Sequence, residues 1–283
     1  MRRTKIGIAE LVGAVTASLV VLFAATMPAF AEAEAGVERL SFSNGVSAIL
    51  YTAPYFDKRL TELNGQPAFR LDDGRFIPVI IEISDPAIYN KGDGSFHPFE
   101  PQLVEAVLSA LVHPSLRLSV HVYLLPYPRR TVVASATNGV EIFLCPHVLA
   151  IEPAVGAYIV THELGHAFHN RFLPDQSEKW TEYRRLRGIT DGSRFRETSS
   201  HAYRPKEIFA EDFRVLFGGV DARMDGRIEN TDLASPETVG GLKEFFVRAA
   251  AMEPWREPKS IATSVPDRLS KITPGPAVRE RAP

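Results

Sequence analysis

The sequence predicts an α+β fold, in which a small mixed or antiparallel sheet packs on one helix and is followed by a helical subdomain. Short apolar segments separated by turn residues fill the chain up to Leu144, and one amphipathic helix interrupts them. Helical patterns dominate after Pro153. Strands that precede a block of helices are typical of α+β proteins, whereas βαβ proteins alternate the two element types.

The first part of the chain is predicted to be rich in strands. Residues 32–75 form a β-rich lead-in whose short apolar pieces are separated by turn dipeptides, namely Asn44-Gly45, Asn64-Gly65 and Asp73-Gly74. The run 76–84 is dense in β-branched residues and predicts a strand. Residues 101–111 carry an amphipathic helical stripe. Further strands are expected at 118–125, and at 131–136 and 140–144 as a hairpin around Asn138-Gly139.

The second part is predicted to be helical. A helix over 154–172 stops before Pro174, and a helix over 205–217 has proline in its first turn. Two more helices are expected at 177–187 and 236–251. The proline-rich residues 254–283 predict a flexible tail, which leaves 76–253 as the main domain.

The N-terminus has the pattern of a secretory signal peptide. Basic residues precede an apolar run over 11–25, and Ala29-Phe30-Ala31 matches a cleavage site. Glu10 shortens the apolar run to about 15 residues, below the roughly 20 that span a bilayer. We therefore expect residues 1–31 to be removed and the protein to be secreted or periplasmic; an uncleaved anchor is the alternative.

Composition excludes several partners. The formal net charge is -2 with interspersed signs, so we expect neither nucleic acid nor, after cleavage of the signal peptide, a membrane as a partner. The single cysteine, Cys145, excludes an intrachain disulfide, and we expect it to be a small buried apolar residue.

The helix at 154–172 contains His162-Glu163-Leu164-Gly165-His166. Residues four apart lie on one helix face, so His162 and His166 can present two imidazole nitrogens to one zinc ion. Glu163 projects beside the open coordination position, where a general base is needed. Gly165 is costly inside a helix and indicates a close approach of another backbone.

A catalytic zinc takes three protein ligands and one water. The metzincin pattern would place a third histidine where Phe172 stands, which excludes that family. Asp175 and Asp191 are possible ligands, but the helix at 205–217 is favoured because it carries Glu207 and Glu211 on one face. Two adjacent carboxylates on a largely apolar helix require a cation. We assign Glu207 as ligand and Glu211 as the acceptor of a ligand histidine's other ring N–H, with the reverse assignment left open.

The motif His162-Glu163-x-x-His166 followed by Glu207-x-x-x-Glu211 resembles gluzincin-type zinc metallopeptidases, and the sequence of the second helix is similar to lethal-factor-like peptidase domains. This resemblance implies a zincin-like fold and hydrolysis of peptide bonds in a peptide or protein substrate, with one catalytic zinc and Glu163 as general base. By position it also implies Tyr203 or His201 as the group that stabilises the oxyanion.

Alternatives remain for the function and for single residues. A non-catalytic, zinc-stabilised peptide-binding protein is the main rival, although Glu163 argues against it; a processing factor for one exported partner is a third possibility. We expect the segment 140–144 to be an edge strand that aligns substrate, and His169 to line the cleft without chemistry. Structural roles are expected for His97, His113, His121 and His147. The run Asp221–Gly226 is discounted as a calcium loop because Arg223 occupies its third position.

Overall fold

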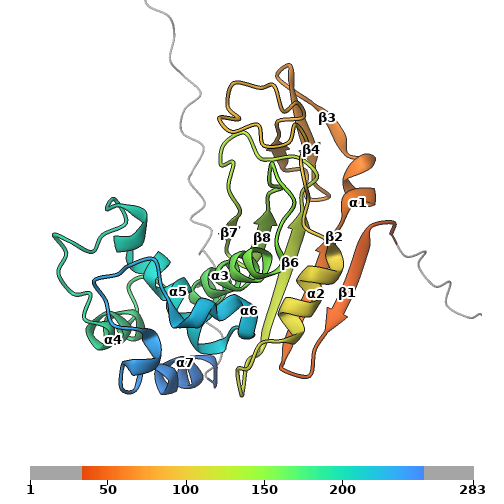
Figure 1. The fold of residues 1–283 in the computed structure, drawn as a ribbon. Helices are drawn as coiled ribbons and strands as arrows, with labels where there is room; N and C mark the ends of the chain where they lie inside the picture. The colour runs from red at the N-terminus through yellow and green to blue at the C-terminus, as the bar shows by residue number, and fades with distance from the viewer. Residues whose placement is uncertain (1–33, 252–283) are drawn as a thin grey trace, which may run out of the picture. The chain divides into compact units, whose positions relative to one another are not determined.

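The computed structural model describes residues 34–251 (Figure 1). The predicted signal peptide and the proline-rich tail therefore lie outside the described residues. Within 34–251, no helix is both long and apolar enough to cross a membrane.

A five-stranded mixed sheet forms the centre of the fold. Its strands lie in the order β1 (Val37–Ser41), β2 (Val46–Tyr51), β6 (Leu118–Leu124), β8 (Glu141–Leu144) and β7 (Ala136–Asn138). The two outer pairs are antiparallel, and the two inner pairs, β2 with β6 and β6 with β8, are parallel. The predicted lead-in thus supplies two strands of the same sheet that carries β6 and β8. Strand β7 is an edge of this sheet.

Helices cover one face of the five-stranded sheet. Helix α2 (Pro101–Ser109) and helix α3 (Pro153–Phe172) lie across β2, β6 and β8 (Figure 1). Alternate residues of β2 are buried, as expected for a strand with one face in a core. They pack with Val104, Leu164 and Phe168 in the main hydrophobic cluster. Each such fully buried apolar side chain contributes about 1.5–3 kcal/mol, so this face anchors α3 firmly.

A smaller sheet packs on the other face. It is antiparallel, in the order β3 (Leu60–Leu63), β4 (Gln66–Arg70) and β5 (Phe76–Pro78), and it follows the short helix α1 (Ala53–Asp57). Phe56 and Phe69 contribute to a second apolar cluster with Tyr123, Phe143 and Cys145. The cysteine is 1% exposed, as predicted for a buried apolar residue.

The C-terminal part is helical, in agreement with the predicted α+β order. It contains α4 (Glu178–Arg187), α5 (Pro205–Phe217), α6 (Val220–Arg223) and α7 (Leu242–Ala251), with short 3-10 turns at η1 (His201–Tyr203), η2 (Met224–Gly226) and η3 (Pro236–Thr238). Helix α5 crosses α3 so closely that a Cβ atom on Gly165 would lie 2.8 Å from the Ala210 Cα. Glycine is required there because the two backbones meet.

Three element predictions are wrong in extent. The strand expected at 76–84 ends at Pro78, after which Val79 and Ile80 donate backbone hydrogen bonds to Pro67 and Pro128 instead of continuing a ladder. The first strand of the predicted hairpin covers only Ala136–Asn138. The helix expected at 236–251 is divided into η3 and α7, because Gly241 has a φ of +80°.

Candidate metal centre

Helix α3 brings two histidines together at the site. Helix α3 begins at Pro153, and its apolar face packs on the sheet. The His-Glu motif lies on the side of α3 that contacts α5. The Nε2 atoms of His162 and His166 lie 3.1 Å apart. Both nitrogens therefore point to one position from successive turns of α3.

Glu207 completes this cluster from the first turn of α5. Its Oε2 lies 3.2 Å from His162 Nε2 and 3.0 Å from His166 Nε2. These three side chains each offer a ligand atom within 4.8 Å of the other two. Burial would raise the pKa of Glu207, but the two imidazoles outweigh it and hold this pKa well below its usual range. Two imidazole nitrogens and one carboxylate are one of the donor sets found in three-ligand catalytic zinc sites.

Glu211 lies one turn further and faces the other nitrogen of His162. Its Oε1 is 2.9 Å from His162 Nδ1 and accepts a hydrogen bond from the Tyr158 hydroxyl at 2.8 Å. Arg214 donates to its Oε2 at 2.8 Å. Burial raises the pKa of Glu211, yet the bonds from His162 and Arg214 prevail and lower it to about 2. An ionised Glu211 keeps the proton of His162 on Nδ1 and leaves Nε2 free as a ligand atom.

Arg214 is itself held in place. The side chain has no exposed surface, its guanidinium lies 4.4 Å from the centroid of the Tyr158 ring, and it donates to the backbone oxygens of Ala222 and Arg227. A buried arginine with these partners neutralises the buried carboxylate of Glu211. Arg214 therefore holds the carboxylate of Glu211, and Glu211 in turn holds the imidazole of His162.

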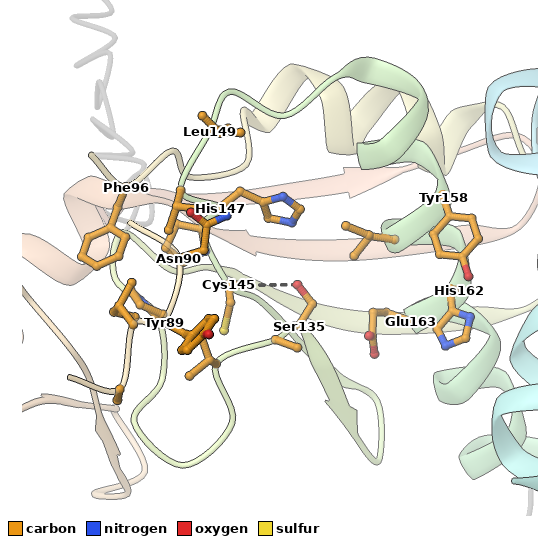
Figure 2. A pocket seen from close by; sticks show the side chains of 18 of the residues that line it. Tyr89, Asn90, Phe96, Ser135, Cys145, His147, Leu149, Tyr158, His162 and Glu163 are labelled. Carbon is orange, nitrogen blue, oxygen red and sulfur yellow. Dashed lines mark hydrogen bonds between the residues drawn. The ribbon is translucent and has the colours of Figure 1, made fainter. Parts of the chain in front are cut away.

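Glu163 lies next to His162 and lines two spaces. It is 6% exposed and lines a cavity of about 820 Å³ and, on its other side, a cleft of about 580 Å³. The hydroxyl of Thr137, on strand β7, lies 2.7 Å from Oε2 of Glu163 and 3.0 Å from its backbone oxygen. Figure 2 shows Glu163 and His162 together at one end of the cavity. Glu163 therefore borders both spaces while its side chain stays almost fully buried.

The two candidates for oxyanion stabilisation differ in position. His201 lies at the cluster, with Nε2 at 3.3 Å from Glu207 Oε2 and Nδ1 at 2.6 Å from Glu229 Oε2. Tyr203 is turned away, because its hydroxyl donates to Asp232. The structure brings His201 to the site and leaves Tyr203 outside it.

Other predicted residues are also placed. Asp175 accepts a hydrogen bond from Lys206 at 2.7 Å, and Asp191 accepts one from Ser193 at 2.6 Å, so neither joins the histidine cluster. The expectation that His169 lines the cleft is wrong: it is 2% exposed and packs on Trp180 and Phe209.

The predicted edge strand at 140–144 is also wrong, because β8 lies between β6 and β7 and the edge is β7. Strand β7 pairs with the side of β8 that we had expected to be a free edge. Any substrate that pairs with the sheet on this side must therefore pair with β7.

Sequence reasoning missed four residues that contact the site. Thr137, Tyr158 and Glu229 carry no motif, although Tyr158 lies four residues before His162 and is on its helix face. Arg214 lies three residues after Glu211, and its side chain is completely buried against that carboxylate. His147, expected to be structural, lines the large cavity.

Comparison of the chain with family models, curated proteins and solved structures finds no match.

Proposed function

We propose that this protein is an exported zinc metallopeptidase, secreted or periplasmic, that hydrolyses peptide bonds in a peptide or protein substrate. The observation that carries the proposal is the convergence of His162 Nε2, His166 Nε2 and Glu207 Oε2 within 4.8 Å, with Glu163 beside them on a large cavity. The gluzincin-like motif pair supports it, as does a mixed sheet with an edge strand next to the motif helix, which suits a zincin-like fold.

His162, His166 and Glu207 would hold one zinc ion, with Glu211 holding the Nδ1 proton of His162. The donor set fits, since two imidazoles and one carboxylate leave a fourth position open. When bound, zinc supplies Lewis-acid polarisation of a carbonyl and lowers the pKa of a coordinated water toward about 7.

The side chains of the chain would then move the protons of hydrolysis. Glu163 accepts a proton from the attacking water, whose oxygen bonds to the carbonyl carbon, and passes that proton to the nitrogen of the leaving amine as the C–N bond breaks. His201, whose Nε2 lies 3.3 Å from Glu207 Oε2, would donate a hydrogen bond to the oxygen of the tetrahedral transition state. Glu229 fixes the orientation of His201 by binding its other nitrogen.

The test is zinc analysis combined with cleavage of a peptide library by the wild type and by Glu163→Gln. We expect one zinc per chain in both proteins and a large loss of cleavage in the variant, because the amide cannot accept the proton. Protein without stoichiometric zinc would contradict the metal site. Zinc-loaded wild type that binds peptides but cleaves no more than Glu163→Gln would favour the non-catalytic peptide-binding alternative.

A further inference from the structure

Residues 227–232, which lie between η2 and η3, contact both sides of the candidate metal centre, and we call them the bridging segment. They form neither a helix nor a strand. They bond nevertheless to the η1 turn, which carries His201, and to helix α5, which carries Glu207 and Glu211. These specific partners distinguish the segment from an ordinary surface connection, which is usually mobile.

The three residues of η1 each bond to the bridging segment. The pairs are His201 with Glu229, Ala202 with Asn230, and Tyr203 with Asp232. The side-chain amide of Asn230 donates to the backbone oxygen of Ala202 at 2.8 Å. The other two bonds join side chains, and His201 Nδ1 lies 2.6 Å from Glu229 Oε2. The segment therefore holds the whole turn, and His201 within it.

The same segment supports Glu211 on α5. The backbone N–H of Glu229 donates to Glu211 Oε2 at 3.3 Å. The backbone oxygen of Arg227 accepts a hydrogen bond from the buried guanidinium of Arg214, which also binds Glu211. Glu229 thus bonds through its backbone to the carboxylate behind a proposed metal ligand, and through its side chain to His201.

Asn230 is the buried anchor of the bridging segment. It is 3% exposed, whereas the side chains of Glu229 and Asp232 are 40% and 48% exposed. Its amide donates to Ala202 O, and its Oδ1 accepts a hydrogen bond from the backbone N–H of Asp232 at 3.1 Å. Displacing this side chain would leave buried polar groups without partners, which is unfavourable. Asn230 therefore fixes the segment against η1.

His201 depends on this support for its orientation. Its side chain is 51% exposed, and its two ring nitrogens face carboxylate oxygens of Glu229 and Glu207. An exposed imidazole can adopt several rotamers, so a fixed carboxylate at one nitrogen determines where the other nitrogen points. The position of Glu229, and hence of the bridging segment, sets the direction of His201 Nε2.

On the basis of the proposed peptidase function, we propose that the bridging segment positions His201 and the carboxylate of Glu211 as one unit, and that Asn230 is the positioning residue that holds this unit together. Asn230 lines neither the large cavity nor the cleft beside Glu163. It therefore acts through the residues that it places.

A double-mutant cycle between Asn230→Ala and His201→Ala tests this role. In the zinc-saturated wild-type background, we expect Asn230→Ala to lower kcat by about tenfold or more and to change KM by less than about threefold. In the His201→Ala background the same substitution should lower kcat by less than about twofold, because the group that it positions is already absent. Asp225→Asn is the matched control, since the Asp225 side chain is 94% exposed and bonds to neither η1 nor α5 within the described residues.

Two further measurements do not depend on cleavage. Chelator competition should show zinc affinity reduced by about three- to tenfold in Asn230→Ala and by less than about twofold in Glu229→Gln, which keeps the backbone N–H that binds Glu211. Nitrogen-15 NMR of the zinc-loaded proteins should show the Nδ1 resonance of His201 shifted in both variants, because each weakens the contact with Glu229.

Equal losses of kcat on Asn230→Ala in the two backgrounds would overturn the positioning role, since a purely structural residue behaves in that way. Wild-type zinc affinity in Asn230→Ala, or an unshifted His201 resonance in Glu229→Gln, would overturn it as well. If Asn230→Ala does not fold, the resonance in Glu229→Gln decides the outcome. A wild type that cleaves no peptide would count against the peptidase function, and the zinc affinities and the histidine resonance would still decide the role of the segment.

Discussion

The two glutamates of α5 should be separable by experiment, because each would fail in a different way. Glu207 lies between two imidazole nitrogens and its side chain is 17% exposed, whereas Glu211 is 3% exposed and is paired with the buried Arg214. The informative variants are Glu207→Gln and Glu211→Gln, which keep shape and remove charge.

For Glu207→Gln we expect loss of a direct ligand and a fall in zinc affinity beyond about 100-fold. For Glu211→Gln we expect a fall of about 10–100-fold, because the three proposed ligands remain and the hydrogen bond that supports His162 at Nδ1 is weakened. That range corresponds to about 1.4–2.7 kcal/mol. Competition with a chelator of known affinity measures both values.

Stability of the metal-free protein should show the opposite order. Glu211→Gln leaves the guanidinium of Arg214 buried without its carboxylate, which costs about 3–5 kcal/mol. Glu207→Gln removes no partner of an arginine and should cost less. Urea unfolding of the metal-free proteins measures this difference. Near-wild-type zinc affinity in Glu207→Gln, together with abolished binding in Glu211→Gln, would refute the assignment.

Three further predictions concern packing, pH and metal. Gly165→Ala should lower the free energy of unfolding in urea by about 1–3 kcal/mol and weaken zinc binding, because the new Cβ would lie 2.8 Å from Ala210 Cα. Gly192→Ala is the neutral control, since a Cβ there has no neighbour within 4 Å. Burial lowers the pKa of His113 to about 4, so the unfolded protein binds a proton at this side chain first and the free energy of unfolding falls as pH drops from 6.5 toward 4. Burial lowers the pKa of His169 to about 4 as well, so His113→Leu should reduce the total loss by up to about 3 kcal/mol and leave the share of His169. Zinc at 100 times its Kd should stabilise the wild type by about 2.7 kcal/mol and leave His166→Ala unchanged in a thermal shift assay.

The elements that carry the site were predictable because local signals define them. Helices α3 and α5 begin at Pro153 and Pro205 and end at Phe172 and Phe217, close to the predicted bounds. Their positions follow from proline in the first turn and from 3.6-residue periodicity. Periodicity likewise placed α2 and β6.

The surroundings of the site depend on contacts distant in sequence, which no local pattern records. Thr137 contacts Glu163 across 26 residues, and Glu229 meets His201 across 28. Part of the large cavity forms where the segment around Gly92 contacts Val148. Similarly, the burial of Arg214 depends on carbonyl oxygens at Ala222 and Arg227, which lie beyond the end of α5.

The choice between Glu207 and Glu211 shows why spacing was insufficient. Residues four apart share one helix face, so the sequence alone makes both glutamates candidates. What distinguishes them is where α5 crosses α3. The close contact between Gly165 and Ala210 puts Glu207, three residues before the crossing, opposite the Nε2 atoms, and puts Glu211, one residue after it, opposite His162 Nδ1. The glycine inside the motif therefore has a positional role: by allowing this contact it determines which carboxylate faces the two Nε2 atoms.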